Sequence, residues 1–457
     1  MPDPVQNFFA RNLFLRDLLA WAAVLVPLLA AWAVRRARRA RWTAFAGASI
    51  SFACALLMHS GTAPIPGIFG VDALGWLPMV LFAALTMLTI VAAPVRDASP
   101  KALAGMLVIL AGTSTVYSAG HLAVCALGHA ATLLPFLAGW FEEDVPRPAK
   151  AVMLTGLGSV AAAAALVELG GPPQAAFALL MLAVLTSKGA LPFHFWIPAA
   201  FEQGPLLPLS LLANGHIGAL FVARFGVALF PEQSKVALTA VSAVALVTAL
   251  ATALLAVSER SPRRILALLS VSQASFILAG LESESPEGIT GAAVHWLVVA
   301  TAVMGLAIVY RLVEVRCPSV AWPEGYLGLA GRMPRLAAFF AVCGLTLVGL
   351  PGTLGFVAED LLFHGAIESH AKLGLALPLA TAINAITFLR LFATIFLGQR
   401  VASLPHLPDA RRRERWALSV CVALLVLGGL FPQVAVSARR GVSKAIAGAA
   451  SGEDASR

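Results

Sequence analysis

The sequence is short of charge, and this shortage excludes an ordinary soluble domain. Only 12% of its 457 residues are charged, whereas 59% are hydrophobic; soluble domains carry about 25% charged residues. Most of the surface must therefore be solvated by lipid.

Cysteine is scarce too. The five cysteines are scattered and none forms a CxxC pair, so they indicate neither a disulfide framework nor a structural zinc site.

The net charge of +9 does not indicate a nucleic-acid-binding protein. The basic residues fall in short loops between apolar runs, where they act as orientation signals for a membrane protein. Asp3, Arg11 and Arg16 precede the first apolar run. We therefore expect no removable signal peptide.

About fourteen apolar segments are long enough to cross a bilayer, which takes about 20 residues. They lie near 17–34, 43–59, 73–95, 102–118, 119–140, 150–169, 173–198, 205–230, 236–257, 263–281, 288–310, 335–362, 373–399 and 415–432. Because each segment must satisfy its own backbone in lipid, helices are expected. The sequence thus predicts an all-α polytopic protein of the bacterial inner (plasma) membrane.

Basic residues alternate between the loops and so predict the orientation. The odd-numbered loops are basic, beginning with the run at 35–41, whereas the even loops carry almost no basic residues and the one at 282–287 is acidic. The positive-inside rule then places the odd loops in the cytoplasm and both termini outside. Arg439, Arg440 and Lys444, on the predicted outside, are an exception.

Lys188 lies sixteenth in its span, near mid-depth. A charge there costs about 2.5–3.5 kcal/mol on insertion scales, and the side chain is too short to reach an interface easily. Gly189 and Pro192 follow, and proline weakens the helix by removing a backbone donor. Broken helices at mid-depth mark ion sites in transporters. We predict that Lys188 exchanges protons with internal water beside this helix break.

A second interrupted span lies at 348–365, VGLPGTLGFVAEDLLFHG. Pro351 and Gly352 break the apolar run, and Glu359 and Asp360 follow it. Two interpretations stay open: the acids cap a helix end at the interface, or they carry protons inside the membrane.

Histidines occur in several central spans and beside the second break. One of them alone favours a structural role, but together with a lysine and a glutamate they indicate proton transfer, because histidine titrates near neutral pH. The histidines are His121, His129, His194, His216, His295 and His364. Asn214 and Gly215 are expected to loosen span eight beside His216.

Spans four to eight and nine to thirteen can be laid side by side. In each set the fourth span carries a Pro/Gly break and an ionisable residue, Lys188 in one and Glu359 in the other. An odd number of spans per unit inverts the second unit, which is typical of secondary transporters. The expected organisation is a three-helix segment (1–100), two inverted five-helix repeats (101–230 and 236–400), and a last helix with a tail (401–457).

Three segments resemble the antiporter-like membrane subunits of complex I, Mrp antiporters and membrane-bound hydrogenases. SKGALPFHFWIPAAFEQGP (187–205) resembles the lysine-bearing seventh helix of this family. SERSPRRILALLSVSQASF (258–276) is similar to its basic loop and tenth helix, and GRMPRLAAFFAVCGLTLVGLPGTLGFVAEDLL (331–362) to its twelfth. The resemblance implies two inverted five-helix units around a central proton-conducting polar axis.

The sequence also departs from this family. The fifth-helix glutamate, which pairs with the seventh-helix lysine, is replaced by Ala130 beside His129. The eleventh-helix lysine is replaced by His295, and Glu359 stands where lysine is often found. Span eight is about one turn shorter, and the chain ends about 25 residues after the last span, without a lateral helix.

A chain with half of the usual charges fits a complex I pump module poorly. The segment GTLGFVAEDLLFHG (352–365) resembles a divergent branch, the membrane subunit of DAB-type inorganic carbon uptake complexes. That resemblance implies a large peripheral cytoplasmic partner with a zinc site similar to β-carbonic anhydrases, in which ion flow drives hydration of CO2 to bicarbonate. This chain itself would be no enzyme and hold no cofactor, with zinc confined to the partner. The alternatives are a subunit of a redox-driven proton pump or cation/proton antiporter, with proton or sodium as the ion, and a non-conducting membrane anchor.

Overall fold

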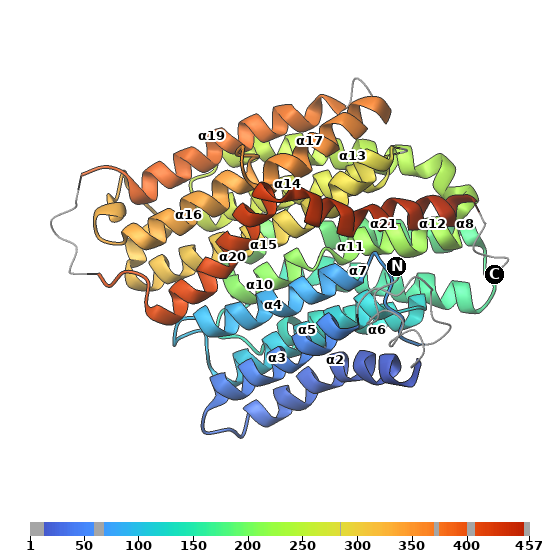
Figure 1. Cartoon of the computed structure of the whole chain (residues 1–457), viewed down its shortest axis with the longest axis horizontal. Coiled ribbons are helices and arrows are strands. Elements are labelled where there is room, and N and C mark those ends of the chain that lie inside the picture. Colours follow the sequence, from blue (N-terminus) through green and yellow to red (C-terminus); the bar gives the residue numbers. More distant parts are fainter. Residues whose placement is uncertain (1–12, 59–67, 284, 370–373, 400–406, 452–457) are drawn as a thin grey trace.

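The computed structural model describes residues 13–58, 68–283, 285–369, 374–399 and 407–451. These form a bundle of helices whose axes run mostly side by side (Figure 1). The first half of the bundle contains α2 (Leu13–Val34), α3 (Ala40–Leu57), α4 (Trp76–Ala92), α5 (Pro100–Ser118), α6 (Leu122–Leu137), α7 (Arg147–Glu168), α8 (Pro173–Lys188), α9 (Trp196–Gln203), α10 (Leu206–Asn214), α11 (Ile217–Leu220), the π-helix η1 (Phe221–Gly226) and α12 (Val227–Leu229).

The second half begins with the longest helices. It contains α13 (Pro231–Ser258), α14 (Pro262–Leu281), α15 (Pro286–Arg316), the short 3₁₀ turns η2 (Pro318–Ala321) and η3 (Leu329–Gly331), α16 (Pro334–Leu347), α17 (Leu354–Ser369), α19 (Ala376–Phe396), α20 (Arg412–Leu430) and α21 (Pro432–Ser451). Proline opens many of these helices, because its fixed φ suits the first turn and its missing N–H would lack a partner there anyway.

The helices account for the number of spans expected from the sequence. Among the described residues, nine helices are long and apolar enough to cross a membrane, and the bent pair α20–α21 forms a tenth candidate. Four shorter apolar helices, α4, α6, α8 and α16, bring the candidates to fourteen. Two of them, α8 and α16, are continued beyond a break by α9 and α17. The prediction of an all-α polytopic membrane protein is confirmed.

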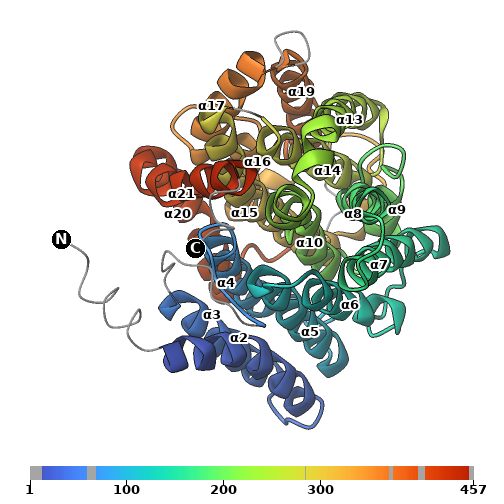
Figure 2. The ribbon, with the colours of Figure 1, turned by 90° about the vertical axis from the view of Figure 1, so that its right-hand side faces the viewer.

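The centre of the bundle is formed by α14 and α15. The apolar stretch of α15 is 100% buried and that of α14 is 94% buried, whereas the stretch of α2 is only 33% buried. Viewed along the bundle, α15, α14 and α10 lie inside, and α2, α7 and α19 lie at the periphery (Figure 2). Polar side chains of α14 and α15 therefore face protein rather than lipid.

Two spans are interrupted where the sequence places its glycines and prolines. Helix α8 ends at Lys188, and Gly189 (φ +61°) closes it by donating its N–H to the carbonyls of Leu185 and Thr186. Helix α16 ends before Gly349 (φ +75°) and Gly352 (φ +88°). Left-handed backbone costs glycine little, so both breaks are encoded locally.

Span eight is interrupted at a residue other than glycine. Helix α10 ends at Asn214 and α11 begins at Ile217. Between them His216 adopts a left-handed conformation, with φ +43°. Left-handed conformations of residues other than glycine are uncommon and cluster at functional sites. A π-helix, another frequent companion of functional sites, follows at Phe221–Gly226.

The end of the chain differs from the sequence interpretation. The last apolar run was expected at 415–432 with a tail beyond it, but α20 bends by 87° into α21, which packs along α15. Arg439 on α21 is fully buried and donates to the carbonyls of Ala73 and Leu74. It therefore caps backbone groups inside the fold, which accounts for one of the three basic residues that break the charge alternation, whereas Arg440 and Lys444 are exposed.

Candidate functional site

A lysine–histidine pair lies at the centre of the bundle. The Lys188 ammonium donates to His216 Nδ1 over 3.1 Å. The two side chains are only 4% and 1% exposed. A neutral imidazole accepts this hydrogen bond without cancelling the charge of the ammonium. The pair therefore keeps a transferable proton at the helix breaks of spans seven and eight.

Gly218 lets the two broken spans approach each other. A Cβ atom at this position would lie 2.8 Å from Lys188 Cγ and 3.0 Å from the Val184 carbonyl oxygen. Both distances are shorter than ordinary van der Waals contacts, and the carbonyl belongs to a helix backbone that cannot easily move. Gly218 thus fixes how closely the Lys188 side chain approaches α11.

We expect Gly218→Ala to displace the Lys188 side chain from His216. Overpacking of this kind costs about 1–3 kcal/mol of stability, and ion transport should fall more sharply than the amount of folded protein. Gly226→Ala in the same span is the matched control, since its nearest neighbour would be 3.7 Å away. Transport measured in vesicles and normalised to folded protein tests this, and equal transport by the two variants would contradict it.

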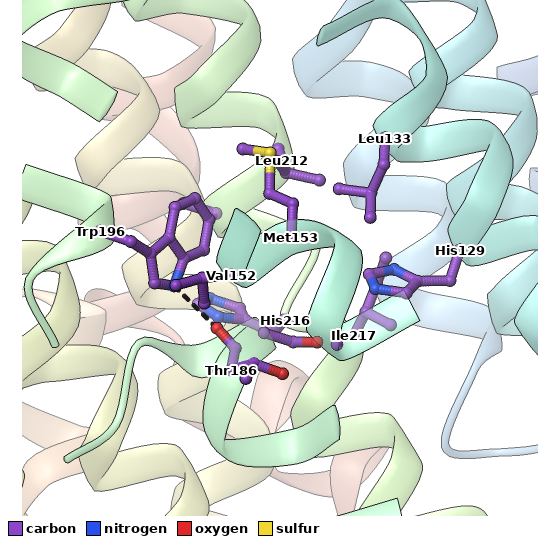
Figure 3. A pocket seen from close by; sticks show the side chains of 12 residues that line it. His129, Leu133, Val152, Met153, Thr186, Trp196, Leu212, His216 and Ile217 are labelled. Atoms are coloured by element: carbon purple, nitrogen blue, oxygen red, sulfur yellow. Dashed lines mark hydrogen bonds between the residues drawn. The ribbon is translucent and has the colours of Figure 1, made fainter. Parts of the chain in front are cut away.

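A small cavity connects the pair with His129 (Figure 3). Its volume is about 20 Å³, and its lining includes His129, Ser187 and His216. This is room for about one water molecule. His129 Nδ1, Ser187 Oγ and His216 Nε2 are buried and have no hydrogen-bond partner in the structure. The cavity thus has unpartnered polar atoms of both histidines in or beside its lining, to which a water molecule could hydrogen-bond.

Further polar groups extend from the pair towards the second broken span. His295 Nε2 donates to Gln273 Oε1 over 2.9 Å, and both Lys188 and His216 interact electrostatically with His295. The Gln273 side chain lies near Glu359, and its Nε2 has no hydrogen-bond partner among the described residues. Thr381 Oγ1 donates to Glu359 Oε1 over 3.3 Å. These groups form a polar axis inside the bundle.

Glu359 is buried because α17 turns it inward. It is 3% exposed, and a Cβ on Gly349 would lie within 2.2 Å of its Oε2. The carboxylate therefore folds back against the break of span twelve. This position excludes the interpretation in which Glu359 caps a helix end at the interface.

Three predicted site residues lie away from this axis. The side chains of Asp360 and His364 are 57% and 76% exposed on the outer face of α17, because a residue next to Glu359 must point elsewhere around the helix. His194 lies in the break at 189–195, half-buried beside Phe195 with an unpartnered Nδ1. The structure thus places Asp360 away from the polar axis, and its part in proton transfer stays a prediction.

Some contributors could not be recognised from the sequence. Gln273, Thr381 and Ser187 are common polar residues, and only their depth in the bundle distinguishes them. Trp296 lies edge-on to His216, with ring centroids 5.6 Å apart. The best available signal was a run of small polar residues, SVSQAS, in an otherwise apolar span.

A network of ion pairs closes the predicted cytoplasmic end of the bundle. Arg311 binds Asp97 through two hydrogen bonds of 2.7 Å, and also binds Glu143 and Glu314. Arg263 binds the same two glutamates. The network therefore joins the segment after α4, the segment after α6 and the start of α14 to the end of α15.

Two arginines within the spans donate hydrogen bonds to backbone carbonyls of neighbouring segments. Arg224 pairs with Asp72 and donates to the Tyr117 carbonyl over 2.7 Å. Arg390 donates to the carbonyls of Ala256 and Glu259.

Over the residues that the structure describes, no group of three or more His, Cys, Asp or Glu side chains could hold a metal ion.

The chain is similar in sequence to known membrane subunits. Residues 158–384 match the family described as NADH:quinone oxidoreductase/Mrp antiporter, TM. The chain is 31% identical over 265 residues to NADH-quinone oxidoreductase subunit N 3 of Streptomyces griseus, an alignment covering 56% of this chain and 47% of that protein. It is 25% identical over 492 residues to subunit M of Rhodobacter capsulatus, covering 94% of each. The chain thus spans about half the length of the subunit N relative.

Solved structures share the fold. A chain of respiratory complex I from Thermus thermophilus superposes with a TM-score of 0.81 at 24% identity, covering 94% of this chain and 99% of that chain. A chain of the Mrp complex from Dietzia sp. DQ12-45-1b gives 0.80 at 20% identity, covering 94% and 97%. At these identities the likeness concerns the fold.

The molecule is a multi-pass membrane protein with broken helices around a buried polar axis. In sequence and fold it is similar to the antiporter-like membrane subunits of the complex I and Mrp type. These matches support the alternative of a redox-pump or antiporter subunit more than the narrower assignment to carbon uptake.

Proposed function

We propose that this chain is an ion-translocating, antiporter-like subunit of a multisubunit membrane complex, and that its ion is the proton. The observation that carries the proposal is the buried Lys188–His216 pair, held 3.1 Å apart between two helix breaks. Ionisable groups inside a membrane are costly, so they are retained where they serve transport. Any catalysis would reside in other subunits.

The polar axis suggests a route for the proton. His129 would exchange protons with His216 through the cavity between them, and His216 with Lys188. His295 and Gln273 then lead towards Glu359. Each step uses groups that both donate and accept protons or hydrogen bonds. With the odd loops in the cytoplasm and both termini outside, the route lies near the middle of the inner membrane.

Ala130 stands where related subunits are expected to place an acid. In this chain His216 occupies the position of hydrogen-bond partner to Lys188. We propose that the histidine replaces the carboxylate as the group that takes the proton from the lysine. Lys188 would then not be held charged by a counter-ion, which favours proton release.

Glu359→Gln provides the main test of proton transfer through the second broken span. Glutamine keeps the size and the hydrogen bond from Thr381 but cannot release a proton. We expect proton flux in vesicles, followed with a pH-sensitive dye, to fall by about 10²-fold, the contribution typical of a positioned acid or base. The complex should still assemble.

Glu232→Gln is the matched control for flux, because its side chain is 78% exposed at the start of α13. Flux that survives Glu359→Gln would contradict the proposed route. Flux carried equally well by sodium at constant pH would show that the ion is sodium.

A narrower proposal is that the complex takes up inorganic carbon. It is motivated by the segment GTLGFVAEDLLFHG and by Ala130, and it implies a large cytoplasmic, zinc-containing partner similar to carbonic anhydrase. Purification of the tagged chain with its partners distinguishes the possibilities: a soluble zinc protein favours carbon uptake, and quinone-reductase, hydrogenase or Mrp subunits favour a redox pump or antiporter. Normal growth of Lys188→Ala cells at ambient CO2 would remove the carbon proposal.

The remaining alternative is a non-conducting membrane anchor. The missing acid at Ala130 is the observation in its favour. An anchor would predict that the activity of the purified complex does not change when an uncoupler collapses the proton gradient. A conducting subunit predicts that the activity does change.

A further inference from the structure

The outer face of α17 carries polar side chains at a depth where lipid is expected. Asp360 and His364 are four residues apart and therefore lie on the same side of the helix. Their side chains are 57% and 76% exposed. Phe356 and Ile367 lie on the same side and are 45% and 42% exposed. We call these four residues the α17 outer face.

The neighbouring helices define the depth of this face. A Cβ on Gly365 would lie 2.3 Å from the Cα atom of Gly288, which is the third residue of α15. Gly365 is therefore level with the first turn of α15. Asp360 precedes Gly365 by five residues, which places it about 7.5 Å deeper along the helix. It lies between the interface and the break of span twelve.

In the part of the chain that the structure describes, the ion-pair neighbour of the Asp360 carboxylate is the imidazole of His364, at 3.6 Å. His364 Nδ1 donates to the Asp360 carbonyl oxygen over 2.8 Å, whereas it lies 3.6 Å from the carboxylate oxygen Oδ1. The ring is thus engaged by the backbone, and the carboxylate keeps its acceptor capacity. A carboxylate facing hydrocarbon is costly, and such groups pair with a partner.

We propose that the α17 outer face binds a membrane-spanning helix of another subunit, and that this helix presents a lysine or arginine to Asp360. Charge complementarity identifies the partner, since a cationic donor satisfies the carboxylate and removes the cost of exposing it to lipid. Phe356 and Ile367 flank the ion pair with apolar contact surface. The position of α17 at the edge of the bundle leaves this side open to a partner (Figure 2).

This interface is separate from the proton route. Glu359 and Asp360 are consecutive residues, but one points into the polar axis and the other away from the bundle. An inactive Glu359→Gln variant should therefore retain the partner. Conversely, failure of the proton-transfer proposal would leave this inference standing.

Site-specific photo-crosslinking in the native membrane, with the full chain and its complex, tests the inference. A benzophenone amino acid is placed at Phe356 or at His364, and at Leu389 of α19, which is 52% exposed on another helix. We expect Phe356 and His364 to capture one and the same integral membrane subunit, and Leu389 not to capture it. Asp360→Lys should reduce the Phe356 crosslink at least tenfold, and replacement of the partner's basic residue by glutamate should restore it.

The inference is overturned by any of three results. These are crosslinks to lipid alone at Phe356 and His364, crosslinks to a second copy of this chain, and an undiminished crosslink in Asp360→Lys. Asp360→Leu distinguishes loss of the interface from misfolding. Leucine is compatible with lipid, so this variant should fold and still show a weaker crosslink. The amount of folded chain is measured for every variant by gel filtration in detergent.

Discussion

Lys188→Met is expected to stop proton translocation while the complex still assembles. Methionine retains much of the length and apolar stem of lysine but cannot carry a proton, and the side chain is only 4% exposed. Loss of a positioned proton carrier typically costs 10²–10⁴-fold in rate. We therefore expect flux in vesicles to fall by about 10²-fold or more.

Folding should tolerate this change. A buried ammonium is costly without a strong counter-charge, and His216 supplies only a neutral acceptor. Removing the buried charge favours folding, whereas the acceptor left unpaired at His216 Nδ1 disfavours it. We therefore expect stability to be unchanged or slightly increased. Unfolding in detergent, measured beside the flux, distinguishes loss of chemistry from loss of structure.

Lys235→Ala is the matched control for Lys188→Met. Lys235 is exposed and pairs only with Glu232 at a distance of 3.2 Å. Exposed pairs contribute little to stability, so both flux and stability should match the parent protein. The lysine hypothesis fails if Lys188→Met carries proton flux within a few-fold of this control.

Among the variants proposed here, Arg311→Ala is expected to lower the free energy of unfolding the most. The Arg311 side chain is 5% exposed and binds three carboxylates, those of Asp97, Glu143 and Glu314. Its removal leaves Asp97 without this partner and Arg263 alone between the two glutamates. Breaking a buried ion pair in this way costs about 3–5 kcal/mol, because a charge stays buried without compensation.

Arg264→Ala tests whether the effect depends on burial rather than on charge. Arg264 also binds two carboxylates, Glu259 and Glu202, but its side chain is 36% exposed. We expect a loss of at most about 1 kcal/mol. Denaturant unfolding of the purified chain in mild detergent compares the two variants, and similar losses for both would show that the buried network does not hold this end of the bundle together.

Hydropathy alone was sufficient to determine the class of the protein. Lipid cannot satisfy backbone groups, so apolar runs of about 20 residues become helices whatever their neighbours are. The breaks beside Lys188 and before Glu359 were also readable, since proline removes a donor and glycine accepts a left-handed backbone wherever they occur. These features are local in sequence.

Composition alone predicts the wrong environment for Arg439 in the last helix. Helix α21 contains Arg439, Arg440 and Lys444 and so reads as an aqueous tail. In the structure Arg439 is buried because the carbonyls of Ala73 and Leu74, more than 360 positions earlier in the chain, accept its hydrogen bonds. No local pattern marks such a partner.

The sequence by itself determined which groups are ionisable at membrane depth, because the cost of placing Lys188 and Glu359 there depends only on the apolar residues around them. Tertiary structure decided which residues these groups contact. His216 lies 28 residues from Lys188 and reaches it only because two interrupted spans pack together at Gly218. Likewise only packing directs Glu359 inward and Asp360 outward, since a helix gives neighbouring residues different directions but does not say which one faces the protein.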